Sequence, residues 1–144
     1  MTGKPVNKDI FRKVERVLYD YPLLAQRLAV LEQYLIARCN ISEGYITLDS
    51  HGIGSSIEER VILAKEKDKE YQALLLKIEA VRKACEMLPD DLKRLVEIYY
   101  FKRKSRFAVM EELAISERSF YRLRKRALEY CAHVIGERAL NAIA

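Results

Sequence analysis

The chain has 144 residues, of which 50% are hydrophobic and 33% charged, and its formal net charge is +5. This apolar content excludes a disordered chain and predicts a mostly helical globular protein of one domain or two small ones. No run approaches the roughly 20 apolar residues of a membrane span, and the N-terminal sequence MTGKPVNKD lacks the apolar core of a signal peptide. We therefore expect a cytoplasmic protein with no membrane partner.

The N-terminal part is predicted to be helical on both sides of a proline. Asn7 can cap a first helix, which Pro22 should break or kink at Tyr21. The next segment carries leucines at heptad-like intervals, which is typical of a short coiled coil or of a helix buried in a bundle. These leucines are Leu24, Leu28, Leu31 and Leu35.

Residues 40–56 are predicted to form a loop, because they lack a helical period and hold three of the five glycines. The piece Tyr45–Leu48 could be briefly extended. Gly52–Ser56 resembles a phosphate-binding loop only superficially, since no apolar strand precedes it and no lysine stands at the required place. A flexible linker is the better interpretation.

A capping box at Ser56–Glu59 predicts the start of one long helix that runs to about Leu88. About 30 residues at 1.5 Å each would make it roughly 45 Å long. Such a helix must pack along its length on the N-terminal helices or on a second copy of the chain. Its seam, interrupted by Asp68 and Arg82, comprises Tyr71, Leu75, Ile78 and Cys85. We expect residues 1–87 to be a helical scaffold or oligomerisation region.

Residues 88–144 are predicted to form a second domain, which begins with three short helices in Leu88–Leu128. Pro89 suits the first position of a helix. That helix has an apolar stripe at three- and four-residue intervals, made of Leu92, Leu95, Val96, Tyr99 and Tyr100. Ser105 is a plausible N-cap for a second helix, Arg106–Leu113. The residues that this second helix is expected to bury are Phe107, Val109, Met110 and Leu113.

The second and third helices have the pattern of a helix-turn-helix. Ala114–Ser116 is the predicted turn, in which Ile115 fills the angle between the helices and Ser116 caps the third helix. Three- and four-residue spacing again marks the buried face of that helix, which comprises Phe120, Leu123, Ala127 and Leu128. The fold class expected for the whole chain is therefore all-α.

Positive charge is concentrated in this motif. Residues 102–126 hold nine basic and three acidic side chains, a net charge of +6, so the rest of the chain is about neutral. A solvated basic helix in an ordinary bundle is the alternative, but the cap, the turn and the charge together favour binding to double-stranded DNA. The predicted base-reading residues are Glu117, Arg118, Tyr121, Arg122 and Lys125. The predicted contacts to the DNA backbone are Lys102, Arg103, Lys104, Arg106, Ser116, Ser119, Arg124 and Arg126.

The same segment resembles the promoter-reading region four of sigma factors and, more narrowly, the phage and prophage transcriptional regulators of the RinA/ArpU type. The residues that carry the resemblance are Leu88–Asp91, Tyr99–Tyr100, Val109–Ser116, Phe120–Arg122 and Ala127–Leu128. It implies an activator of late genes in the bacterial host cytoplasm, with RNA polymerase as a possible partner. One departure is Ala114, because many such motifs have glycine there.

Other functional classes find less support. Cys39, Cys85 and Cys131 are too far apart for a paired metal site, and neither His51 nor His133 has a ligand neighbour at suitable spacing. We expect no enzyme activity, metal or cofactor. A small terminase subunit is one alternative, although its DNA-binding unit usually comes first in the chain. A protein-interaction adaptor or anti-repressor is another. The two heptad-like seams favour a homodimer or a higher homo-oligomer.

Overall fold

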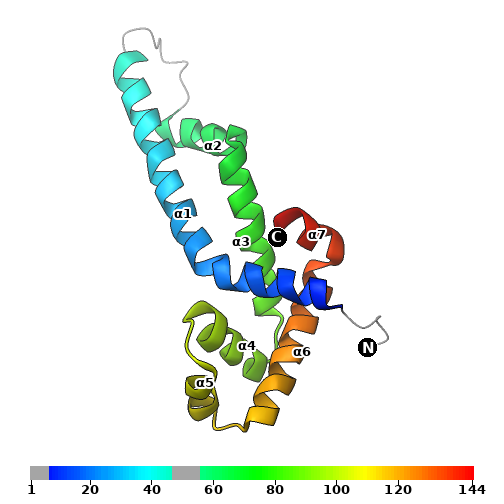
Figure 1. Cartoon of the computed structure of the whole chain (residues 1–144). Coiled ribbons are helices and arrows are strands. Elements are labelled where there is room, and N and C mark those ends of the chain that lie inside the picture. The colour runs from blue at the N-terminus through cyan, green and yellow to red at the C-terminus, as the bar shows by residue number, and fades with distance from the viewer. Residues whose placement is uncertain (1–6, 47–55) are drawn as a thin grey trace. The chain divides into compact units, whose positions relative to one another are not determined.

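The computed structural model describes residues 7–46 and 56–144, although the side chains of residues 41–46 lie outside the description. The predicted all-α fold class is confirmed, and Figure 1 shows helices joined by short turns throughout the described ranges. The elements are α1 (Lys8–Ile46), α2 (Ile57–Lys67), α3 (Lys69–Glu86), α4 (Asp90–Val96), the π-helix η1 (Glu97–Phe101), α5 (Arg106–Leu113), α6 (Glu117–Ile135) and α7 (Glu137–Ile143). Within these ranges, no helix is both long and apolar enough to cross a membrane.

The chain forms two compact units, and their boundaries differ from the predicted domains 1–87 and 88–144. One unit combines Met1–Pro22 with Lys77–Ala144, and the other is Leu23–Leu76. The first unit draws on both ends of the chain because apolar residues of α1 and α3 belong to the same core as the predicted helix-turn-helix. The core residues from outside 88–144 are Ile10, Val14, Val17, Leu18, Val81 and Ala84.

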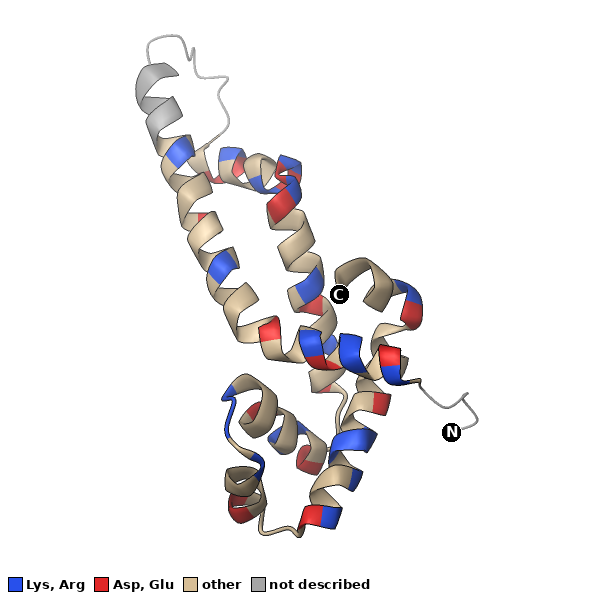
Figure 2. Ribbon diagram, viewed as in Figure 1, with Lys and Arg blue, Asp and Glu red and all other residues tan. Residues whose placement is uncertain are grey.

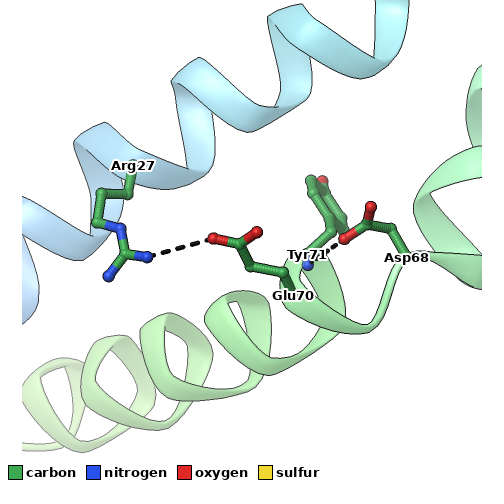
Figure 3. Close-up of polar contacts among 4 residues, drawn as sticks. All are labelled: Arg27, Asp68, Glu70 and Tyr71. Atoms are coloured by element: carbon green, nitrogen blue, oxygen red, sulfur yellow. Dashed lines mark hydrogen bonds and ion pairs between the residues drawn. The ribbon is translucent and has the colours of Figure 1, made fainter.

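The predicted leucine seam of α1 is partly buried within the unit Leu23–Leu76. Leu24 and Leu35 are buried and Leu28 is half-buried. Two ion pairs link α1 to the following helices, one between Lys65 and Glu32 at 2.8 Å and one between Arg27 and Glu70 at 3.2 Å (Figure 3). A second stripe of α1 stays exposed, and its large apolar members are Leu23, Val30 and Tyr34.

The predicted single helix from Ser56 to Leu88 is wrong, because it is divided at Asp68. The capping box does start α2, since Ser56 Oγ accepts a hydrogen bond from Glu59 N. At Asp68 the backbone is extended, with φ −79° and ψ 113°. Its Oδ1 accepts a hydrogen bond of 2.8 Å from Tyr71 N (Figure 3), so Asp68 caps α3. The seam interruption noted at Asp68 is thus the start of a new helix.

Helix α1 departs from the prediction in two respects. Of the break or kink predicted at Tyr21, a break does not occur, because the helix continues through Pro22. It also continues to Ile46, so residues 40–46 are helical and Tyr45 is not extended. A proline inside a helix removes one backbone hydrogen-bond donor. Each residue added to an existing helix gains a hydrogen bond without a new nucleation cost, so α1 continues past Pro22. The rest of the predicted loop, including Gly52–Ser55, lies outside the described residues.

The helices around the predicted helix-turn-helix follow the apolar pattern with one exception. Leu92, Leu95, Val96 and Tyr100 are buried as expected, and Pro89 flanks α4 as its N-cap. Phe107, however, was expected in the core and is 67% exposed. Two residues turn a helix by about 200°, so Phe107 and the buried Val109 must lie on opposite faces of α5.

Candidate nucleic-acid interface

The α5–turn–α6 geometry confirms the predicted helix-turn-helix. Ser105 Oγ accepts a hydrogen bond from Ala108 N, which caps α5 as expected. Ala114 ends α5 in the left-handed region, with φ 54° and ψ 49°. Ser116 Oγ then accepts a hydrogen bond of 3.1 Å from Ser119 N and caps α6. The turn therefore has the positive φ that many related motifs supply with glycine.

Helix α6 has one buried and one exposed face. The four predicted core residues are buried, and so are Cys131 and Ala132 farther along the helix. All five predicted base-reading residues are exposed, and basic residues recur along α6 in Figure 2. Within the described part of the chain, Arg118, Arg122 and Lys125 have no ion pair, so their charges are available to a ligand.

Arg106 connects α5 to the exposed face of α6. Its Nη1 donates a hydrogen bond to the Tyr121 hydroxyl and lies 3.6 Å from Glu117 Oε1. The guanidinium carbon is 4.9 Å from the ring centroid of Phe107 and 5.5 Å from that of Tyr121. Arg106 thus contacts two of the predicted base-reading side chains, whereas the sequence predicts only a contact to the DNA backbone for it.

Arg124 differs most from the predicted DNA contacts. Its Nη2 lies 2.8 Å from Oε2 of Glu15 on α1, and the Tyr100 hydroxyl donates a 2.9 Å hydrogen bond to the same oxygen. Burial, together with the Glu15 carboxylate, raises the pKa of Tyr100 above its ordinary value. The network ties α6 to α1 and η1, so Arg124 has a structural partner inside the protein.

The loop between η1 and α5 presents basic residues beside the motif. Lys102, Arg103 and Lys104 are all exposed. Arg103 has a positive φ of 53°, and its Nη2 donates a 3.0 Å hydrogen bond to the backbone carbonyl of Tyr19. The Lys104 ammonium lies 3.5 Å from Glu112. Both pairings are exposed, and such pairs contribute little and yield readily to a competing anion.

The remaining predicted backbone contacts divide into two kinds. Arg126 is exposed on α6. The hydroxyls of Ser116 and Ser119, by contrast, bond to each other at 3.1 Å within the cap of α6. A hydroxyl that already serves a cap has less capacity to bond a phosphate.

Cys85 and Cys131 lie in surroundings that do not activate a thiol. Burial raises the pKa of Cys85 to about 11 and that of Cys131 to about 12. Both thiols are therefore protonated at neutral pH, and the thiolate is the reactive form. Among the described residues, no group of three potential metal ligands comes together.

A helix-turn-helix with a basic exposed face thus defines the architecture of the site. Residues 11–132 match the model of the family described as protein of unknown function (DUF722), and the chain belongs to that family. Searches of curated proteins and of solved structures gave no match.

Proposed function

We propose that the protein is a sequence-specific transcriptional regulator that binds double-stranded DNA through α5 and α6. The observation that carries the proposal is the exposed face of α6, where Arg118, Arg122 and Lys125 project from a capped helix-turn-helix. A recognition helix places long donors on this face, since arginine can bond O6 and N7 of guanine together in the major groove.

The surrounding basic residues would supply affinity that does not depend on sequence. The sequence predicts six backbone-binding cations, but Arg124 is held by Glu15 in a half-buried pair and Arg106 by both Glu117 and Tyr121, whereas Lys104 has only an exposed pair with Glu112. The remaining four are Lys102, Arg103, Lys104 and Arg126. At 0.9 per phosphate contact, the log–log dependence of affinity on salt should have a slope of about −3.6.

A binding experiment with matched variants tests this proposal. Duplexes selected by the full chain from a random library serve as the specific probe, and scrambled duplexes serve as the control. Arg122→Ala should reduce the preference for the selected duplex by about 1–3 kcal/mol, because a base contact is lost. Lys102→Ala should weaken binding to both duplexes equally. The proposal is wrong if the wild-type chain binds no duplex or if its affinity is insensitive to salt.

The narrower assignment to phage or prophage late-gene activation rests on the resemblance to the RinA/ArpU regulators. It places the protein in the bacterial cytoplasm and makes RNA polymerase a candidate partner. Genome-wide footprinting of bound sites tests it, because sites upstream of packaging and virion genes are expected for such an activator. Sites confined to packaging start sequences would favour a small terminase subunit instead.

We also propose that the regulator is a homodimer or a higher homo-oligomer, because two half-sites raise the affinity for DNA. The exposed stripe Leu23, Val30 and Tyr34 is the apolar surface on α1 available for this contact, since Leu24 and Leu35 are buried within one chain. Val30→Glu should then reduce the mass measured by light scattering. A wild-type mass equal to the 16.8 kDa of one chain would contradict dimerisation.

A further inference from the structure

Phe107 is a large apolar side chain of the helix-turn-helix that lies outside the core. It lies at the second position of α5 and is 67% exposed. Burying a side chain of this size is favourable, and Val109, two residues on, is fully buried in the same short helix. The exposed ring therefore needs an explanation other than the packing of this chain.

Phe107 shares its surroundings with Tyr121 of α6. Both rings lie near one guanidinium, that of Arg106, at 4.9 and 5.5 Å from ring centroid to guanidinium carbon. The hydroxyl of Tyr121 accepts a hydrogen bond from Arg106, and the Tyr121 side chain is still 44% exposed. One cation thus lies beside two aromatic rings, one from each helix of the motif.

The chemistry of this surface favours a base edge over a phosphate. The Phe107 ring offers no donor to a phosphate oxygen, and the Arg106 guanidinium is already engaged by the Tyr121 hydroxyl and by Glu117 at 3.6 Å. The Glu117 carboxylate would also repel a phosphate placed beside it. In the major groove, the apolar feature of a base edge is the 5-methyl group of thymine, which aromatic side chains can contact.

We propose that Phe107 and Tyr121, held by Arg106, form a contact surface for the 5-methyl group of a thymine in the recognised DNA. This inference rests on the proposed DNA-binding function and adds a base that the arginines of α6 do not read. Phe107 then determines specificity from α5, while Arg106 is a positioning residue that fixes the two rings.

Uracil substitution tests the contact, because it removes the methyl group and preserves every hydrogen-bonding group of the base. The probes are one duplex selected by the full chain from a random library and its derivatives with a single thymine replaced by uracil. The wild-type chain should lose affinity about fourfold at one or two positions, which is the effect of burying one methyl. Phe107→Ala should bind the thymine duplex more weakly and show no further loss with uracil at those positions.

Two controls make the outcome decisive. Lys102→Ala should bind all probes more weakly but keep the uracil effect, because a phosphate contact does not sense the methyl group. Circular dichroism should show that Phe107→Ala is folded, as expected for an exposed side chain. The inference is overturned if no thymine matters to the wild type, if the selected site lacks thymine, or if Phe107→Ala keeps the full uracil effect. Failure of the wild type to bind any duplex would instead refute the DNA-binding function on which the contact rests.

Discussion

Leu18 provides a sharp test of how the unit that contains the helix-turn-helix is built. It lies in α1, 70 residues before the predicted DNA-binding domain, yet it is fully buried in the same core as Tyr100 and Leu128. Leu18→Ala should lower the free energy of unfolding by about 2–5 kcal/mol, because truncation of a buried leucine loses transfer energy and leaves a cavity. A unit of about 90 residues has a total stability on the order of 5–13 kcal/mol, so this loss is a large share.

Thermal melting and DNA titration together measure the effect. The Leu18→Ala chain should melt at a lower temperature and lose DNA binding as the unit unfolds, although Leu18 lies outside the helix-turn-helix. The matched control is Leu76→Ala, which truncates a leucine that is 59% exposed and should change stability little. Equal melting temperatures for the two variants would refute the inference that α1 completes the core of the helix-turn-helix unit.

Three further predictions follow from single contacts. Ala114→Gly should raise the melting temperature by a few degrees, because the left-handed conformation costs a residue with a Cβ about 1–2 kcal/mol. Glycine avoids this cost, and the greater chain entropy that it loses on folding cancels only part of the gain. An unchanged or lower melting temperature would show that this turn is unstrained. Arg126→Ala should reduce the salt slope of DNA binding by about 0.9, whereas Arg124→Ala should lower the melting temperature by leaving Glu15 unpaired; the reverse assignment would mean that Arg124 does reach the phosphates. Burial and then a hydrogen bond to Tyr99 raise the pKa of Tyr19 from 10.0 to about 12, so its contribution to stability should be complete below pH 10 and disappear as the pH rises towards 12; urea unfolding of Tyr19→Phe should show a smaller alkaline loss than the wild type, and an identical loss would contradict the assignment.

Local sequence signals predicted the helix-turn-helix well. Ser105, Ala114 and Ser116 were identified correctly because capping and turn formation depend on residues within three or four positions of each other. The signal at Asp68 was of the same kind, but the apolar period on both sides favoured a continuous helix. An aspartate that interrupts a seam is better interpreted as an N-cap when helix-forming residues follow it.

The parts that sequence did not predict depend on contacts between distant residues. Glu15 and Arg124 are 109 positions apart, and nothing near either residue indicates the pairing. An arginine on a basic helix was therefore assigned to DNA although it points into the protein. The exposure of Phe107 has a different cause, because its helical angle relative to the buried Val109 places it on the opposite face of α5 despite its apolar character.

The division of the chain has a consequence for its synthesis on the ribosome. Residues Leu23–Leu76 form a compact unit that is continuous in the sequence. The α1 residues Ile10, Val14, Val17 and Leu18, by contrast, are synthesised long before Leu140, which belongs to the same core. At 5–20 residues per second, they remain without Leu140 for on the order of ten seconds. A chain that stops before Leu140 should therefore leave the core around Val14, Val17 and Leu18 incomplete, so the proposed DNA binding should arise only after α7 has been synthesised.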